Sequence, residues 1–279
     1  RGYRVQQAQR LATQRRQSAS KCPSKMNEVT ISLIEEKLKK QWSPEQISGW
    51  MKKTKYNCIV SHETIYKFIW EDKKKGGHLF KELRHHGKKY NKRGKKNSGR
   101  GCIPNRIDID ERPKIVEKKE RIGDWELDTI VGTGSSGSIV SMVDRASKLT
   151  KLALVRRGTS ENIKGALLRC LKPLENDVLT LTSDNGKEFS KHQEVSSALG
   201  TNFFFAKPYH SWERGLNEHT NGLVRQYFPK NKRFDEITVR DLEKVERLLN
   251  NRPRKILKFR SPVEVFRHRA KSVSVALHC

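Results

Sequence analysis

The chain has 279 residues, and its 59 Lys and Arg against 31 Asp and Glu give a formal net charge of +28. The length accommodates two domains, and 34% hydrophobic residues suffice for a buried core, so a disordered basic tail is excluded. The charge excludes most metabolic enzymes and predicts a polyanionic partner, above all nucleic acid, whose phosphates release counterions when Lys and Arg neutralise them.

A membrane surface is the other polyanion to consider, and the sequence argues against it. No apolar stretch approaches the roughly 18 residues that a spanning helix needs, and the N-terminal RGYRVQQAQR lacks the apolar core of a signal peptide. The five cysteines lie far apart, without a C-x-x-C pair, so neither a zinc site nor a disulfide framework is expected. We predict a soluble intracellular protein without a membrane partner.

Three helix-start signals follow one another in residues 27–72, after a polar, basic stretch at 1–26 that we expect to be an arm. Asn27 precedes the helical apolar period of NEVTISLIEEKLKKQW, and Ser43 begins a capping box with a Pro at the first helical position. Ser61 precedes a third helix in SHETIYKFIW. Three short helices joined by tight connections predict a helix-turn-helix region.

In such a region the third helix enters the major groove, and side chains near its N-terminal end contact the base edges. The predicted DNA contacts of this helix are His62, Glu63, Tyr66 and Lys67. A three-helix bundle without a DNA role fits the spacing about equally well. The segment that follows favours DNA, because residues 73–100 contain twelve Lys or Arg and one acid. We therefore predict a basic linker at 73–111.

Apolar runs bounded by turn residues then indicate a second domain at 112–270, before a tail at 271–279. The predicted strands are 124–131, 138–144, 149–156, 178–184 and 202–206. The predicted helices are 160–171, 188–199 and 211–227. A meander of three strands followed by alternating helices and strands indicates an α/β domain with a mixed sheet.

Three acids occupy positions that packing alone does not require: Asp128 inside the first strand, Asp184 at the end of the fourth, and Glu218 in the last helix. An acid inside an apolar strand is costly unless a cation meets it. Carboxylates select Mg²⁺ or Mn²⁺, and two such ions activate an attacking hydroxyl and stabilise the leaving oxygen in phosphoryl transfer. Each acid also has an ordinary interpretation, as a turn residue, the partner of a Lys, or part of a solvated helix face.

The three acids in WELD, TSDNGKEF and NEHTNGLVRQYFPK resemble the pattern of DDE transposases and integrases. The last two are separated by 218 − 184 − 1 = 33 residues, and this spacing within PYHSWERGLNEHTNGLVRQYFPK is similar to that of bacterial insertion-sequence transposases of the IS30 family. The downstream LNNRPRKILKFRSPVEVF also resembles that family, and the resemblance covers about residues 2–267. It implies a ribonuclease-H-like mixed sheet flanked by helices, preceded by an all-α helix-turn-helix region.

The resemblance assigns Asp128, Asp184 and Glu218 as catalytic ligands of two Mg²⁺ or Mn²⁺ ions per active site. Glu213 is a competing acid, but it leaves only 213 − 184 − 1 = 28 residues after Asp184, fewer than the family spacing, so Glu218 is preferred. We expect the Asn-Gly pair after Asp184 to let the chain turn sharply there. The predicted DNA contacts of this domain are Arg214, Asn221, Arg225 and Lys230.

The predicted function is that of a DNA transposase. Its helix-turn-helix region would bind terminal inverted repeats, and its acids would cleave a strand and direct the 3′-hydroxyl into target DNA. The implied partners are double-stranded DNA and further copies of the chain, as a homodimer or larger synaptic assembly. The implied location is the bacterial cytoplasm, associated with the nucleoid when bound to DNA.

Two other functions stay open at this point. One is a non-catalytic or decayed sequence-specific DNA-binding protein, and the other is a ribonuclease H or structure-specific nuclease, against which the helix-turn-helix region argues. The N-terminal RGYRVQQAQRLATQRR resembles the segment that follows an additional helix-turn-helix in many relatives. We therefore expect this chain to lack that first DNA-reading unit.

Overall fold

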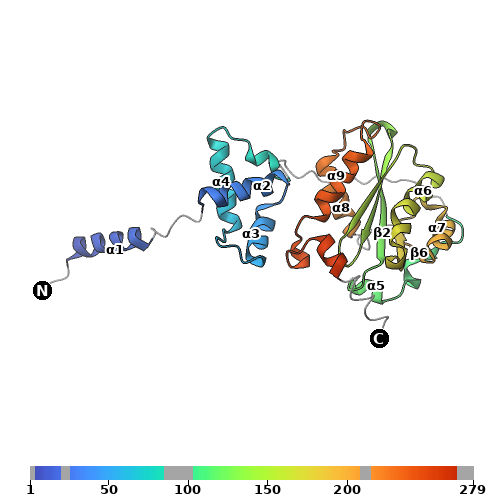
Figure 1. Cartoon of the computed structure of the whole chain (residues 1–279), viewed down its shortest axis with the longest axis horizontal. Helices are drawn as coiled ribbons and strands as arrows, with labels where there is room; N and C mark the ends of the chain where they lie inside the picture. The colour runs from blue at the N-terminus through green and yellow to red at the C-terminus, as the bar shows by residue number, and fades with distance from the viewer. Residues whose placement is uncertain (1–3, 20–25, 85–102, 208–214, 269–279) are drawn as a thin grey trace. The chain divides into compact units, whose positions relative to one another are not determined.

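The computed structural model describes residues 4–19, 26–84, 103–207 and 215–268 of the chain. The chain divides into two compact units, Arg1–Gly87 and Lys88–Cys279, which are described separately (Figure 1). Among the described residues, no helix is both long and apolar enough to cross a membrane.

The first unit is all-α, as predicted. Its helices are α1 (Val5–Ala19), α2 (Glu28–Lys39), α3 (Pro44–Lys53) and α4 (His62–Lys74). The predicted caps are confirmed, because the side chains of Asn27, Ser43 and Ser61 each accept a backbone N–H three residues later. The amphipathic helices α2, α3 and α4 enclose a small core formed by Ile34, Leu38, Ile47, Met51, Ile65 and Ile69.

The two connections of this bundle differ in length. Residues 40–43 join α2 to α3 tightly, as predicted, whereas residues 54–61 form a longer connection between α3 and α4. This longer connection contributes to the core, because Val60 is buried and Tyr56 packs against Trp50 with ring centroids 6.4 Å apart. The core also includes side chains from a 3-10 turn, η1 (Leu79–Glu82), so the unit extends into the predicted linker.

The second unit is built on a six-stranded sheet with the order β1-β6-β5-β2-β3-β4. The strands are β1 (Ile107–Asp108), β2 (Asp124–Val131), β3 (Ser138–Asp144), β4 (Thr150–Val155), β5 (Thr180–Ser183) and β6 (Asn202–Phe205). Strands β2, β3 and β4 form the predicted antiparallel meander, and β5, β6 and β1 continue the sheet in parallel. This arrangement confirms the predicted ribonuclease-H-like mixed sheet.

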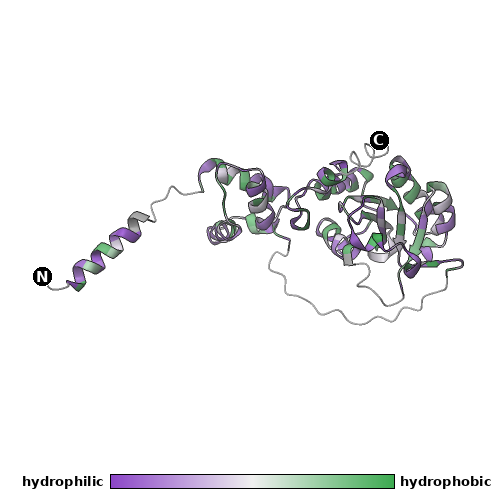
Figure 2. Ribbon diagram, turned by 90° about the horizontal axis from the view of Figure 1, so that it is seen from below, coloured by the Kyte–Doolittle hydropathy of each residue, from purple (hydrophilic) through white to green (hydrophobic). Residues whose placement is uncertain are grey.

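Helices cover both faces of the sheet (Figure 1). One face carries α6 (Ser160–Leu171) and α7 (His192–Leu199), and the other carries α8 (Gly215–Tyr227) and α9 (Val239–Asn250). Alternation along β2 explains this, since Trp125 and Leu127 belong to the core under α6 and α7 while Ile130 belongs to the core under α8 and α9. These helices carry both hydrophobic and hydrophilic residues (Figure 2), as amphipathic covering helices do.

Some elements differ from the sequence prediction. The predicted helix at 188–199 is a 3-10 turn, η5 (Lys187–Phe189), followed by α7, because the chain bends to bury Phe189 against Phe203. The short strand β1 and the helices α5 (Ile115–Lys118) and α9 were not predicted. Ile103 and Ile109 are buried in this unit, so it also extends into the predicted linker.

Candidate functional site

The register between β2 and β5 brings two of the predicted acids to the same end of the sheet. Glu126 of β2 lies beside Thr182 of β5, an offset of 182 − 126 = 56 residues. Asp128 and Asp184 have the same offset, since 184 − 128 = 56, and Asp184 follows directly after the end of β5. Continuing the register therefore places Asp184, just past the end of β5, beside Asp128 in the middle of β2.

The Asp128 carboxylate is held by α8 and by its own strand. Asn221 of α8 donates from Nδ2 to Asp128 Oδ2 at 2.6 Å, and the Thr129 backbone N–H donates to Oδ1 at 3.0 Å. Ser141, directly opposite Asp128 on β3, donates to Asn221 Oδ1 at 3.1 Å. One turn earlier on α8, Asn217 donates to the Leu127 carbonyl at 3.1 Å. Two amides thus fasten α8 to β2 at Asp128.

The segment after Asp184 is fixed by a residue that sequence reasoning missed. Arg106, just before β1, donates to Asn185 Oδ1 at 2.7 Å, while the Asn185 amide donates to the Ala206 carbonyl at 2.6 Å. The Gly186 N–H donates to Asp184 Oδ1 at 3.0 Å. Arg106 is 79 positions from Asn185, so no local sequence pattern could have indicated the contact.

Gly186 lies against the Glu188 side chain and does not take a conformation that only glycine adopts. Its φ of −70° is open to any residue, so the chain does not make a left-handed turn here. A Cβ at this position would instead lie 2.4 Å from Glu188 Oε2. The glycine makes room for the Glu188 carboxylate, which accepts a hydrogen bond from Thr129 Oγ1 at 2.8 Å.

Glu218 lies on the helix that contacts Asp128, three residues before Asn221, and it is exposed. Positions three apart share a helix face, so Glu218 belongs to the side of α8 that faces the end of β2. Within the described part of the chain, however, no three His, Cys, Asp or Glu side chains gather closely enough to hold a metal ion. The oxygen donors fit Mg²⁺ or Mn²⁺ chemically, and the competing Glu213 lies outside the described residues.

The predicted DNA contacts of this unit have different surroundings. Arg225 donates to the Val131 carbonyl at 2.7 Å and stands over the Phe234 ring, and burial lowers the pKa of its guanidinium. Asn221 is engaged with Asp128, as described above. Lys230 is exposed, and Arg214 lies outside the described residues. Of the three that the structure describes, Lys230 has the surroundings most typical of a phosphate contact.

In the first unit, the four predicted base-contacting residues share the outer surface of α4. His62, Glu63, Tyr66 and Lys67 are all exposed, with Tyr66 at 37% of its full accessibility. The buried residues of the same helix are Ile65 and Ile69, which face the bundle core. The structure therefore leaves the predicted surface of α4 open to a partner.

An ion-pair network lies next to the two strands that carry Asp128 and precede Asp184. Arg145 Nε is 3.3 Å from Glu126 Oε1, and both side chains are only 2% exposed. Arg145 also donates to Glu117 at 3.2 Å, and Arg112 donates both to Glu117 and to Thr182 Oγ1. Glu126 and Thr182 each precede a predicted catalytic Asp by two residues, so the network ties α5 to the strands that carry the acids.

Lys148 is a half-buried base next to this network. It donates from Nζ to the Arg145 carbonyl. Burial lowers the pKa of Lys148 to about 8, since removal from water disfavours the charged amine.

Comparison with known proteins gives several matches over nearly the whole of this chain, although no family model matches it. The transposase for insertion sequence element IS4351 of Bacteroides fragilis is 46% identical over 274 residues, 98% of this chain and 83% of that protein. Transposase InsI for insertion sequence element IS30A of Escherichia coli strain K12 is 35% identical, covering 94% and 71% of the two chains. The transposase for insertion sequence element IS1086 of Cupriavidus metallidurans is 34% identical, covering 95% and 80%.

Among solved structures, the catalytic core domain of BIV integrase matches 54% of this chain and 97% of that chain, with 21% identity and a TM-score of 0.44. The sequence matches run through both units and include the segments that carry Asp128, Asp184 and Glu218, since they span nearly the whole chain. The chain therefore belongs to the IS30 family of insertion-sequence transposases.

Proposed function

We propose that the chain is a DNA transposase that cleaves one strand at transposon ends and joins the resulting 3′-hydroxyl to target DNA. The observation that carries this proposal is the 2.6 Å hydrogen bond from Asn221 to Asp128. It fastens α8, the helix that carries Glu218, to β2 at Asp128, beside the end of β5 that Asp184 follows. The names of the relatives support the same activity.

The ligands for Mg²⁺ or Mn²⁺ in this proposal are Asp128, Asp184 and Glu218. When bound, two such ions would activate the attacking oxygen and stabilise the leaving oxygen of the phosphodiester. The contribution of the protein is to orient the carboxylates that bind these ions. Asn221 holds the Asp128 carboxylate in one position, and Arg106 with Asn185 fixes the chain around Asp184. For all three carboxylates to bind the ions together, the exposed Glu218 side chain would have to turn toward Asp128 and Asp184.

The first unit supplies DNA binding in this proposal. The exposed surface of α4, with His62, Glu63, Tyr66 and Lys67, would contact bases in the terminal inverted repeats. The positive charge of the chain would hold both transposon and target DNA through phosphate contacts. Because the reaction joins paired ends, we propose a dimer or larger assembly on the DNA, acting in the bacterial cytoplasm.

The proposal is tested by strand cleavage and joining on labelled DNA that carries the inverted repeats flanking the coding sequence. The full chain and Asp184→Asn are compared with Mg²⁺, with Mn²⁺ and without metal. Metal-dependent cleaved and joined products that disappear in the variant support a transposase. DNA that is bound but stays intact with both proteins supports the non-catalytic DNA-binding protein instead. Cleavage of hybrids without joining would indicate a nuclease.

A further inference from the structure

A cavity of about 300 Å³ lies beside the strand end on the face of the sheet that carries α6. It is bounded by the end of β2, the start of β3, the segment before α6, and η5. Its polar lining comes from Thr129, Ser138 and Glu188, and its apolar lining from Val131 and Ile163. The volume is at the lower end of the range for small-molecule sites, and one nucleobase is a ligand of suitable size.

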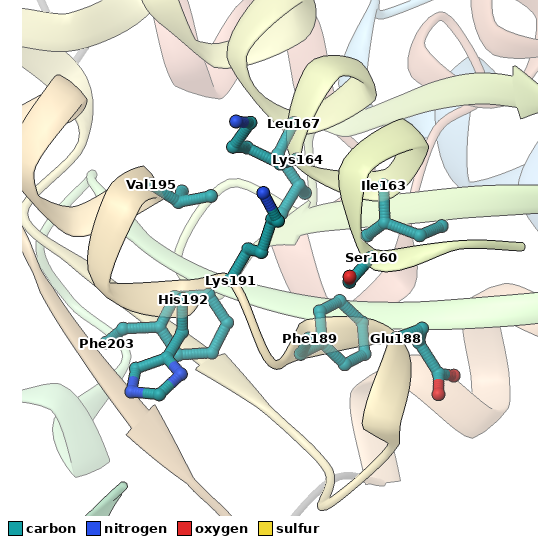
Figure 3. A pocket seen from close by; sticks show the side chains of 10 residues that line it. All are labelled: Ser160, Ile163, Lys164, Leu167, Glu188, Phe189, Lys191, His192, Val195 and Phe203. Atoms are coloured by element: carbon teal, nitrogen blue, oxygen red, sulfur yellow. The ribbon is translucent and has the colours of Figure 1, made fainter. Parts of the chain in front are cut away.

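The Glu188 carboxylate gives this cavity its chemical character. Glu188 is half-buried and accepts a hydrogen bond from Thr129 at 2.8 Å. Figure 3, which draws the neighbouring pocket on the other side of Glu188, shows the Glu188 carboxylate directed away from His192 and Phe203 of that pocket. Within the described residues, no Lys, Arg or His forms an ion pair with it, although the sequence contains 59 Lys and Arg. A half-buried carboxylate with a single hydroxyl donor retains the capacity to accept further hydrogen bonds.

The Glu188 carboxylate favours some parts of a DNA strand over others as ligands of the cavity. A phosphate is disfavoured, because its charge would repel the carboxylate of Glu188. A base that carries an exocyclic amino group is favoured, since such a group donates to a carboxylate. Val131, 54% exposed, offers an apolar surface against which the flat face of a base could pack. The lining therefore matches a nucleobase, which has an apolar face and, where it carries an amino group, an edge that donates hydrogen bonds.

The position of the cavity relates it to the reaction. Thr129 directly follows Asp128, so their Cα atoms are about 3.8 Å apart and their side chains point to opposite faces of the sheet. Glu188 lies four residues after Asp184. The cavity thus lies across β2 from the Asp128 side chain, and a base that leaves the stack beside a phosphate at these two acids would reach it past the end of β5, beyond the residues where β2 pairs with β5.

We propose that this cavity binds one unstacked base of the DNA substrate, and that Glu188 selects a base with an exocyclic amino group. The inference rests on the proposed function, because it assumes that the reacting phosphate lies at Asp128 and Asp184. It adds a base-reading site to the catalytic unit, separate from the predicted recognition helix of the first unit.

The test combines altered proteins with altered bases. In DNA carrying the inverted repeats and in target DNA, each adenine, guanine or cytosine near the reacting phosphate is replaced in turn by purine, hypoxanthine or 2-pyrimidinone, which lack the amino group. Single-turnover cleavage and joining rates are measured for the full chain, Glu188→Gln and Gly158→Val. Glu175→Gln serves as the matched control, because this exposed residue pairs only with the nearby Lys172 among the described side chains.

Gly158→Val fills the cavity without altering Glu188. A Cβ at this glycine would be 3.6 Å from Ser138 Oγ, an ordinary contact that requires no strain. The same DNAs with 2-aminopurine at each position report unstacking as a rise in fluorescence in the bound complex. We expect one position to show this rise with the full chain, and we expect Gly158→Val to abolish it.

At that position, loss of the amino group is expected to slow the full chain and Glu175→Gln about tenfold, as for one charge-assisted hydrogen bond. Glu188→Gln should show a smaller difference between the two bases, since its neutral amide oxygen accepts a weaker hydrogen bond from the amino group than the carboxylate does. The proposal is overturned if no amino group matters to the full chain, or if Glu188→Gln slows all DNAs by one common factor. Absence of any cleavage by the full chain would overturn the proposed function, and this inference with it.

Discussion

Asn221 is the residue on which the geometry of the candidate site depends most directly. Its amide links α8 to Asp128 at 2.6 Å and is itself oriented by Ser141 at 3.1 Å. Amides and hydroxyls that orient a ligand commonly affect metal affinity or activity about 10- to 100-fold. The hydrogen bonds of Asn221 therefore matter more for catalysis than for the stability of the fold.

We predict that Asn221→Ala lowers metal-dependent strand cleavage by about 10- to 100-fold, with a shift to higher Mg²⁺ concentration. The reason is that Asp128 loses the donor that fixes its carboxylate. Rates measured as a function of Mg²⁺ concentration, with thermal melting as a check on folding, test this. Asn251→Ala, an exposed Asn near the end of α9, is the matched control. Wild-type rates in Asn221→Ala would contradict the assignment.

Lys148 gives a prediction about pH. Its pKa of about 8 in the folded chain is below the ordinary value of 10.5. The unfolded chain therefore binds one more proton between these two values, and the free energy of unfolding rises with pH across this window. Below about pH 8 the buried charge destabilises the fold in full. This penalty arises because the amine is partly removed from water and lies near the positive charge of Lys119.

Lys148→Met is accordingly expected to raise the melting temperature at pH 7 by on the order of a few degrees. The difference in melting temperature between Lys148→Met and the unaltered chain should shrink between pH 8 and pH 10.5, because in this range the native lysine loses its proton on folding. Melting curves of both proteins across this range measure the difference. A difference that stays constant with pH would show that Lys148 is charged in the folded chain throughout.

At the scale of elements, local signals were sufficient for most of the fold. The caps Asn27, Ser43 and Ser61 and the apolar runs of β2 and β3 could be predicted because they depend on neighbours within a few residues. The strand β1 could not, since two residues paired with β6 leave no periodic pattern. The catalytic assignments of Asp128, Asp184 and Glu218 depended on their spacing and family resemblance, and stay predictions.

The contacts between distant elements were also beyond local patterns. Asn221 and Asp128 are 93 positions apart, and Arg112 and Thr182 are 70 apart. Such pairs depend on how the sheet and helices pack, which a single sequence does not reveal. The same holds for the contact of Gly186 with the end of the Glu188 side chain.

The ion-pair network gives a prediction for these elements. Arg145→Met leaves the buried Glu126 carboxylate without its main cation, which is expected to cost about 3–5 kcal/mol in the free energy of unfolding. Urea unfolding of the second unit within the full chain measures the loss. The double variant Arg145→Met with Glu126→Met removes both charges and should recover most of it. A single variant as stable as the unaltered chain would show that water reaches Glu126.

At the scale of the whole molecule, the charge of +28 predicts strongly salt-dependent DNA binding. Lys67→Ala on α4 removes one proposed contact, and if that contact is a phosphate, the slope of log affinity against log salt should fall by about 0.9. Lys244→Ala removes the same charge from an exposed position on α9 and serves as the control. Equal slopes of log affinity against log salt for the unaltered chain, Lys67→Ala and Lys244→Ala would contradict a contact between Lys67 and a DNA phosphate.

The central claim is that Asp128, Asp184 and Glu218 together form one metal-dependent active site. The measurement that tests it most directly is metal-dependent cleavage of inverted-repeat DNA by Asp128→Asn, Asp184→Asn and Glu218→Gln, each beside the unaltered chain and with DNA binding measured in parallel. We predict that the unaltered chain cleaves only with Mg²⁺ or Mn²⁺, and that each variant binds DNA without cleaving it. Cleavage at the unaltered rate by any of the three variants would contradict the account.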